Sequence, residues 1–321
     1  MVAPVLSVDR SPAELLDRAT GQAHAKEGVL HRGGKMVLGG ASKTFKTWTL
    51  VDLAVSVGTG RDWLGKFPTK RGRVLYINLE LPAAFFTKRV RDVRDENQVD
   101  LERGYLKVWN LRGRAADLTT LLPLMLQGIG ESRYDLIILD PIYKLLGQRD
   151  ENKAGDIATL LNEIESLAVK TGAAVAFGAH YSKGNQAGKE VIDRIGGSGV
   201  FARDPDTILN FTRHEQDDCF TVESTLRNHP PIKPFVVRWE WPLMCVDSLL
   251  DPAQLKQPGR PQLHHAEDLL ELIEQPMSAT EIVDAAKEIG MERRRVFELL
   301  ADLKRCGKIK QQQKRGKYEL A

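Results

Sequence analysis

The segment that most constrains this chain is a phosphate-binding motif near the N-terminus. An apolar stretch at 35–39 runs into GASKTFKT at 40–47, and a helical pattern follows over 47–57. The segment agrees with the P-loop template G-x-x-x-x-G-K-[ST] at Gly40, Lys46 and Thr47, and it departs from the template at Phe45, where glycine is expected. In a P-loop, backbone N–H groups wrap around phosphates, the lysine reaches their oxygens and the hydroxyl binds Mg²⁺. We therefore predict a nucleotide phosphate site; the alternative is a polar turn that binds no ligand.

Apolar stretches alternate with helical patterns along the following residues. The predicted strands are 35–39, 73–79, 105–109, 135–139, 173–178 and 207–211. The predicted helices are 47–57, 83–96, 118–129 and 154–171. Strands that are apolar throughout are typical of a largely parallel sheet with both faces buried, and the alternation predicts an α/β domain with helices on both faces. Two later stretches, 220–224 and 235–239, are predicted to be antiparallel strands.

Three polar residues end predicted strands. Asp140 ends DLIILD, where a carboxylate can contact Mg²⁺; the alternative is a helix-capping aspartate. Glu80 ends RVLYINLE, a strand that we expect to neighbour the P-loop strand, and it can deprotonate an attacking water or else cap the next helix. His180 follows AAVAFGA and can sense a γ-phosphate; the alternative is a structural histidine. Because open α/β sheets bind ligands at the carboxyl ends of their strands, we predict that these side chains converge there.

Composition excludes several classes of protein. The chain has 321 residues, of which 42% are hydrophobic and 28% charged, values typical of a globular protein of about two domains. Its three cysteines, Cys219, Cys245 and Cys306, have neither disulfide-framework nor metal-ligand spacing, so we expect a reducing, cytoplasmic location. We expect no membrane association, because no apolar run approaches the roughly 20 residues of a membrane span and the N-terminus has no secretory-signal pattern.

Charge is distributed unevenly along the chain. Residues 291–321 carry a net charge of +6, so the preceding residues carry a net charge of −3. A Pro-, Gln- and Gly-rich stretch between the two regions is typical of a linker. The predicted organisation is an N-terminal segment 1–32, an α/β domain 33–250, a linker 251–262 and a C-terminal domain 263–321.

The C-terminal region has the pattern of a winged helix-turn-helix. Its predicted helices are 264–273, 280–289 and 292–306, and its predicted strands are 308–312 and 317–320. Ser278 and Glu281 fit a capping box. Recognition helices contact DNA near their N-termini, and a basic wing can contact phosphates. The predicted DNA contacts are Arg293, Arg294, Arg295, Lys314 and Arg315. The alternative is a module that docks a protein partner.

Five segments, taken in order, resemble a known family. They are GGASKTFKTW, WLGKFPTKRGRVLYINLELP, YDLIILDP, GAHYSKG and GGSGVFARDPDTIL. Over about 33–239 the chain resembles the RecA-like hexameric helicases, in particular the plasmid RepA-type subgroup of AAA-like ATPases, which is distantly related to the DnaB replicative helicases. The resemblance implies a RecA-like P-loop NTPase core, ATP and Mg²⁺ as cofactors, assembly into a homo-oligomeric ring or filament, and binding of single-stranded DNA.

The resemblance also assigns roles by position. Lys46 and Thr47 would be the Walker A pair, Glu80 the general base, Asp140 the Walker B acid and His180 a switch at the head of the DNA loop. The nucleotide-binding residues would be Gly40, Ala41, Ser42, Lys43, Thr44, Phe45, Lys46, Thr47 and Trp48.

Further residues of the resemblance would contact DNA or a neighbouring subunit. The loop 183–199 would contact DNA through Lys183 and Lys189, because cations supply the sequence-independent part of DNA binding. The alternative is a solvated surface loop. Arg227, in STLRNHP, resembles the arginine finger of K-x-R-N, although Thr225 stands where lysine is expected; Arg213 is the second candidate.

Three functions follow from these patterns. The first is an ATP-dependent motor that translocates on single-stranded DNA during plasmid, phage or mobile-element replication. The second is an ATPase that loads other proteins or mediates recombination without unwinding DNA. The third is a nucleotide-sensing DNA-binding regulator without turnover, which Phe45 favours and the pair of Glu80 and Asp140 disfavours.

Overall fold

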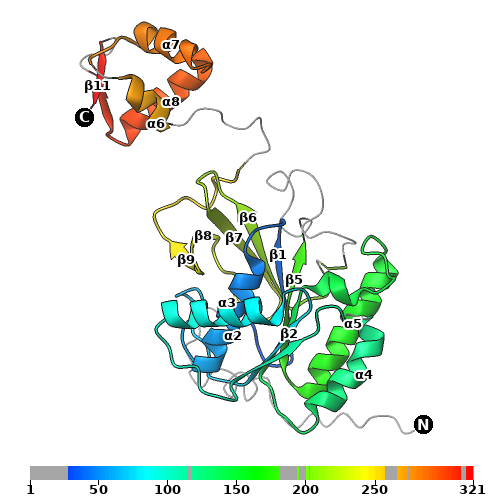
Figure 1. Cartoon of the computed structure of the whole chain (residues 1–321). Helices are drawn as coiled ribbons and strands as arrows, with labels where there is room; N and C mark the ends of the chain where they lie inside the picture. The colour runs from blue at the N-terminus through cyan, green and yellow to red at the C-terminus, as the bar shows by residue number, and fades with distance from the viewer. Residues whose placement is uncertain are drawn as a thin grey trace. The chain divides into compact units, whose positions relative to one another are not determined.

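The chain divides into two units, Met1–Gln257 and Pro258–Ala321. The computed structural model describes residues 28–114, 117–180, 194, 200–201, 203–256, 266–273, 275–311 and 316–320 (Figure 1). The division lies inside the predicted linker, but residues 251–256 belong to the first unit. There, the Lys256 backbone N–H donates to the Arg213 carbonyl at 2.8 Å, and the Thr221 hydroxyl donates to the Pro252 carbonyl at 3.0 Å. The predicted domain end at residue 250 is therefore too early, because hydrogen bonds hold the next residues to the sheet.

The first unit is built on a nine-stranded sheet in the order β3-β2-β4-β5-β1-β6-β7-β8-β9. The six strands from β3 to β6 in this order are parallel, and β7, β8 and β9 extend the sheet in antiparallel pairs. The strands are β1 (Lys35–Gly40), β2 (Val74–Asn78), β3 (Leu106–Asn110), β4 (Leu136–Asp140), β5 (Ala174–His180), β6 (Thr207–Arg213), β7 (Cys219–Leu226), β8 (Phe235–Glu240) and β9 (Leu243–Asp247). The predicted mainly parallel α/β fold is confirmed, and β9 is an additional strand.

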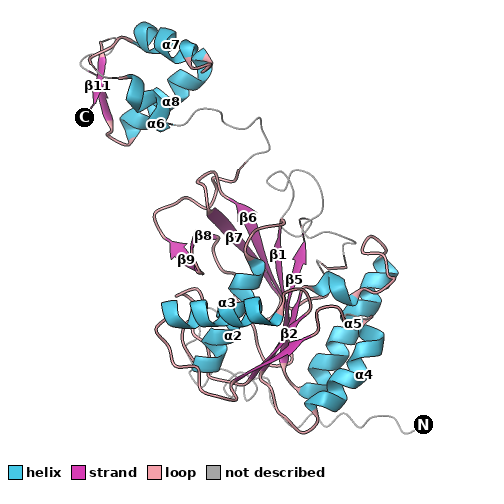
Figure 2. Ribbon diagram, viewed as in Figure 1, coloured by secondary structure: helices cyan, strands magenta, loops and turns pink. Residues whose placement is uncertain are grey.

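Helices cover both faces of this sheet, as predicted (Figure 2). The helices are α2 (Lys46–Thr59), α3 (Ala83–Glu96), α4 (Leu118–Ile129) and α5 (Ala154–Thr171), with a short 3₁₀ helix, η1 (Ile142–Leu145), after β4. Alternate residues of each central strand enter opposite cores, as the pleat requires. Met36 packs in the core that includes Leu50 of α2, whereas Val37 packs in the core that includes Leu160 of α5. Val29, from the predicted N-terminal segment, is also buried in the α2 core.

The sheet order corrects one prediction. The strand that precedes Glu80, β2, does not neighbour the P-loop strand β1, because β4 and β5 lie between them. The register still places the strand ends along one edge: Gly40 lies opposite His180, and Asn78 lies opposite Asp140. The predicted site residues therefore share one end of the parallel strands, although β1 and β2 are not adjacent.

The second unit has its own apolar core. Its elements are α6 (Ala266–Leu272), α7 (Ala279–Glu288), α8 (Arg293–Arg305), β10 (Ile309–Gln311) and β11 (Tyr318–Leu320), with the two strands antiparallel. The predicted order of three helices and a hairpin is confirmed. The predicted capping box is also present: the Glu281 backbone N–H donates to Ser278 Oγ at 3.3 Å, and the Ser278 N–H donates to Glu281 Oε2 at 2.7 Å.

Among the described residues, no helix combines the length and the apolar character needed to cross a membrane.

The separate core of the second unit leads to a stability prediction. Leu300 is 2% exposed within that core. We expect Leu300→Ala to lower the unfolding free energy of this unit by about 2–5 kcal/mol, because a buried cavity replaces the side chain. Calorimetry of the whole chain should show a shift in one transition only, and Ile289→Ala, at a position 43% exposed, should shift neither. An equal shift of both transitions would contradict the independence of the two cores.

Candidate functional site

The loop between β1 and α2 folds closely around Lys46. The ammonium Nζ donates to the carbonyls of Gly40 and Ala41, both at 2.8 Å. Gly40 leaves no room for a side chain, since an added Cβ would lie 2.5 Å from Thr44 Oγ1. Thr44 is buried and donates to the Ala41 carbonyl at 2.9 Å. The lysine is thus positioned at the mouth of a tight loop, at the start of a helix.

Phe45 adopts the left-handed backbone conformation that the template assigns to glycine. Its φ is 57° and its ψ 22°, and Lys43 also has a positive φ of 61°. Such a conformation costs a non-glycine residue about 1–3 kcal/mol. The Phe45 ring stacks on Trp239 of β8, with centroids 4.1 Å apart and planes within 8°. Aromatic pairs contribute about 0.5–1.5 kcal/mol beyond their buried area, so this stacking offsets much of the backbone cost.

Trp48 belongs to the same aromatic group. Its ring lies 5.7 Å from that of Trp239 and 6.3 Å from that of Trp241. The guanidinium of Arg89 on α3 lies 4.6 Å from its centroid. The indole of this predicted nucleotide-binding residue therefore packs against β8 and α3 beside the loop.

Asp140 is the buried acid of the site. It accepts a hydrogen bond from the Tyr76 hydroxyl at 2.8 Å and another from the hydroxyl of Thr47. Burial raises the pKa of Asp140, while these two hydrogen bonds and the charge of Lys46 act against the rise. A carboxylate and a hydroxyl are the oxygen ligands that Mg²⁺ prefers, so Thr47 and Asp140 fit the predicted metal site.

Glu80 is presented by a turn that Asn78 holds. The Asn78 amide donates to the Leu81 carbonyl and to Asn110 Oδ1, both at 2.8 Å, and its oxygen accepts from the Leu81 N–H at 2.9 Å. Glu80 itself is exposed, and its charge acts on both Asp140 and His180. Sequence reasoning gave Asn78 no role, although a buried polar residue that ends an apolar strand was the available signal.

His180 contacts both Lys46 of the phosphate loop and Tyr143, which follows β4. Its Nδ1 lies 3.5 Å from Lys46 Nζ, and its ring centroid lies 5.8 Å from that of Tyr143 in η1. Burial and the charge of Lys46 lower the pKa of His180, so the neutral imidazole is favoured. A neutral ring can accept a hydrogen bond from the lysine and change partners when that lysine moves.

Arg89 is a charged group near the site that sequence reasoning missed. Besides covering Trp48, it interacts with the charges of Asp140 and Glu80, which oppose the lowering of its pKa by burial. Nothing in the helical pattern of α3 distinguishes this arginine from the surface arginines around it, so only the packing identifies it.

The two candidate finger arginines lie at opposite ends of the neighbouring strands β6 and β7. Arg213 ends β6 and is exposed at the end of the sheet where the P-loop lies. Arg227 follows β7 at the end of the sheet away from the P-loop. There its backbone N–H donates to the Asp206 carbonyl at 2.9 Å, and its guanidinium lies 3.6 Å from the Asp206 carboxylate.

The predicted DNA contacts are only partly described. Lys183 and Lys189 lie outside the described residues, as do Lys314 and Arg315. Arg293, Arg294 and Arg295 form the first turn of α8 in the second unit. Arg294 and Arg295 both pair with Glu298, at 3.0 and 3.4 Å.

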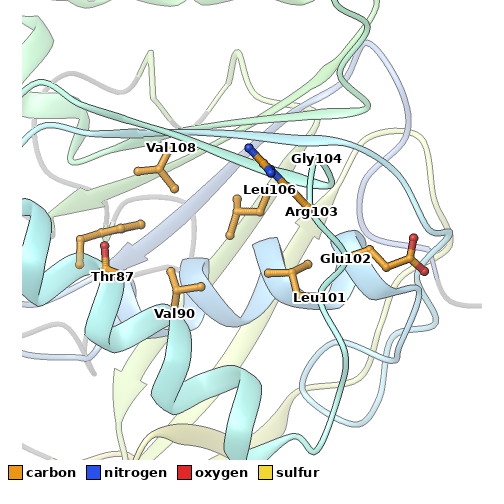
Figure 3. Close-up of a pocket in the computed structure, with 9 residues that line it drawn as sticks. Thr87, Val90, Leu101, Glu102, Arg103, Gly104, Leu106 and Val108 are labelled. Atoms are coloured by element: carbon orange, nitrogen blue, oxygen red, sulfur yellow. The ribbon is translucent and has the colours of Figure 1, made fainter.

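The described part of the first unit contains two cavities whose linings include no P-loop residue: one lies beside α3 and the start of β3, and the other lies after the carboxyl ends of β2, β3 and β4. The first, of about 220 Å³, is where the side chains of Val90, Leu101 and Leu106 turn toward one another (Figure 3). Its lining is mainly apolar. The second, of about 440 Å³, includes Glu80 in its lining.

A family model described as an AAA domain matches residues 9–186, which is more than half of the chain. The chain belongs to this AAA domain family. The match covers the P-loop, Glu80, Asp140 and His180. The AAA domain is a P-loop ATPase domain, which implies nucleotide binding and hydrolysis, usually with Mg²⁺, and the mostly parallel sheet fits such a core. Comparison with curated proteins gave no match.

The backbone of Phe45 in this AAA domain can be tested with a matched pair of variants. Phe45→Gly and Phe45→Val both remove the ring, but only valine must also adopt a positive φ, which β-branched residues strongly resist. We expect Phe45→Val to bind an ATP analogue at least tenfold more weakly than Phe45→Gly. Fluorescence titration with a labelled ATP analogue measures this difference, and equal affinities would mean that the left-handed backbone is unimportant for binding.

The environment of Lys46 predicts proton uptake on nucleotide binding. Burial lowers the pKa of Lys46 from 10.5 to about 8. A bound triphosphate favours the charged amine, so binding at pH 8.5 should take up about half a proton or more, and binding at pH 7 very little. Between about pH 8 and 10.5 the unfolded chain holds more protons at this group, so its contribution makes stability rise with pH in that window.

Calorimetric titrations with a non-hydrolysable ATP analogue, in buffers of different ionisation enthalpy, measure this uptake. Lys170→Ala, which removes an exposed lysine in the last turn of α5 and outside the phosphate loop, should leave the uptake unchanged. Equal uptake at pH 7 and pH 8.5 in the unsubstituted chain would contradict the lowered pKa.

Proposed function

We propose that this chain is an ATP-driven motor of the RecA-like type that moves along single-stranded DNA in the replication of a plasmid, phage or mobile element. The observation that carries the proposal is the contact between Lys46 and His180, 3.5 Å apart, at the edge where Asp140 and Glu80 also lie. His180 lies just before the stretch 183–199, which resembles a DNA-contacting loop. A change at the phosphates can therefore reach that stretch through one side chain.

Each residue of the site has a distinct task in hydrolysis. Lys46 leaves the loop carbonyls and contacts the phosphate oxygens, whose charge its ammonium neutralises. Thr47 and Asp140 are the residues that would hold Mg²⁺, which would add further positive charge at the phosphates. Glu80 accepts the proton of the water whose oxygen attacks the γ-phosphorus, while the bond to the bridging oxygen breaks and ADP keeps that electron pair.

An arginine from a neighbouring subunit would complete the site. Arg227 lies at the end of the sheet away from the P-loop of its own chain. It can therefore approach a nucleotide only when another copy of the chain supplies it. This placement supports a homo-oligomeric ring, hexameric as in the helicases that the chain resembles. Arg213, at the P-loop edge, is the alternative.

In the second unit we propose a winged helix that contacts double-stranded DNA. The first turn of α8 contains three arginines and no acidic residue, and Arg294 is 89% exposed. These features also suit an acidic protein partner, which is the alternative.

Two other functions use the same site. An ATPase that loads other proteins would hydrolyse ATP without displacing a strand from forked DNA. A regulator without turnover would bind ATP and never release phosphate; Phe45, the departure from the template, is the observation that favours it.

The role of Glu80 gives the first test of the proposed motor. We expect Glu80→Gln to keep nucleotide binding and to lower DNA-stimulated ATP hydrolysis by about 10²- to 10⁴-fold, because the general base is lost. Glu131→Gln, which changes an exposed carboxylate at the other end of the sheet, is the matched control. Phosphate release with and without single-stranded DNA is the measurement.

Lys46→Ala should lose nucleotide binding in the same assays. Full stimulated activity in either Glu80→Gln or Lys46→Ala would refute the assigned site. Turnover without strand displacement would select the loader, and binding without turnover in the unsubstituted chain would select the regulator.

A further inference from the structure

The second cavity lies along the same edge of the sheet as the phosphate loop but is separate from it. Its lining is Leu79, Glu80, Arg112, Gly113 and Lys144. These residues follow β2, β3 and β4, whereas the P-loop follows β1, with β5 in between. Glu80 is the one residue that belongs both to this cavity and to the proposed hydrolytic site.

The charges that line the cavity favour an anion. The lining contains two cations, Arg112 and Lys144, and one carboxylate, that of Glu80. Within the part of the chain that the structure describes, neither cation has an ion pair with an acid; the Lys144 ammonium lies 5.0 Å from the Tyr143 ring centroid. A guanidinium fork and an ammonium are groups that recognise phosphate oxygens. The first cavity, with its mainly apolar lining, has no comparable character.

Contacts connect this cavity to the nucleotide loop. Lys144 follows Tyr143 in η1, the Tyr143 ring lies 5.8 Å from His180, and His180 lies 3.5 Å from Lys46 Nζ. An anion that binds Lys144 therefore has a short route of packed side chains to the phosphate-binding lysine.

We propose that Arg112 and Lys144 bind a phosphate group in this cavity, beside Glu80 and apart from the P-loop. The phosphate is either part of the backbone of a DNA strand or the inorganic phosphate that hydrolysis releases. A phosphate bound there would neutralise the two cations that line the same cavity as the Glu80 carboxylate. This inference rests on the proposed function.

The DNA arm of the test compares Arg112→Ala, Lys144→Ala and the double variant with Arg133→Ala. Arg133 is an exposed arginine before β4, at the opposite end of the sheet. Fluorescence anisotropy with a labelled oligothymidylate and a non-hydrolysable ATP analogue is repeated at several salt concentrations. Each lost phosphate contact should weaken binding and make the slope of log affinity against log salt shallower by about 0.7. Arg133→Ala should match the unsubstituted chain, and Arg112→Lys should recover part of the affinity.

The second arm uses inorganic phosphate alone. In a Lys46→Ala background, which removes the phosphate-loop cation, residual phosphate binding is measured by calorimetry with and without Arg112→Ala. Loss of this binding together with unchanged DNA affinity would identify released phosphate as the source. Loss of DNA affinity with the shallower salt slope would identify the DNA backbone.

If the cavity variants equal Arg133→Ala in both arms, with unchanged circular dichroism, the phosphate site is overturned even where ATP hydrolysis and DNA binding persist. If the unsubstituted chain neither binds DNA nor hydrolyses ATP, it is the proposed motor that fails. The calorimetric arm then still decides whether the cavity binds phosphate.

Discussion

The stacking of Phe45 on Trp239 is the interaction on which the rest of the nucleotide loop depends. It connects a strained residue at the start of α2 to β8, in the antiparallel part of the sheet. Phe220 of β7 adds an edge contact to the same ring at 6.1 Å. The antiparallel strands β7 and β8 therefore provide the aromatic side chains against which the phosphate loop packs. This packing holds the backbone that positions Lys46 and Thr47.

The charged groups of the site are held in an environment that disfavours their charges. Burial is the main cause in each case: it raises the pKa of Asp140 and lowers the pKa values of Lys46 and Arg89. Such groups gain more from a ligand of opposite charge than they would in water. These buried charges lower the stability of the chain without a ligand, and binding of a nucleotide with its metal ion offsets that cost.

Much of the fold could be predicted from the sequence. The bounds of α3, α4 and α5 agree with the predicted 83–96, 118–129 and 154–171, because periodic apolar residues face a core and residues such as Gly172 end the helices locally. The order of strands could not be predicted in the same way. Which strand lies beside β1 depends on the crossovers, so the expected adjacency of β1 and β2 was wrong even though the residues at their ends do converge. The strand β9 was missed although it is as long as β2, because it lies at the edge of the sheet and most of its residues are only partly buried.

The site could be predicted only where a residue type and its position in a motif coincide. Lys46, Thr47 and Asp140 satisfy that condition. Asn78 and Arg89 do not, since their roles come from hydrogen bonds and ring contacts between segments that are distant in the sequence.

The stacked pair at positions 45 and 239 also limits how this protein can diverge. A chain with glycine at position 45 adopts the same backbone without strain, and an aromatic ring at position 239 is then no longer required for it. A chain that keeps phenylalanine cannot exchange Trp239 freely. The two positions are therefore expected to covary among descendants of this sequence, and the exchange is easier in one order: glycine is gained first, and tryptophan is lost afterwards.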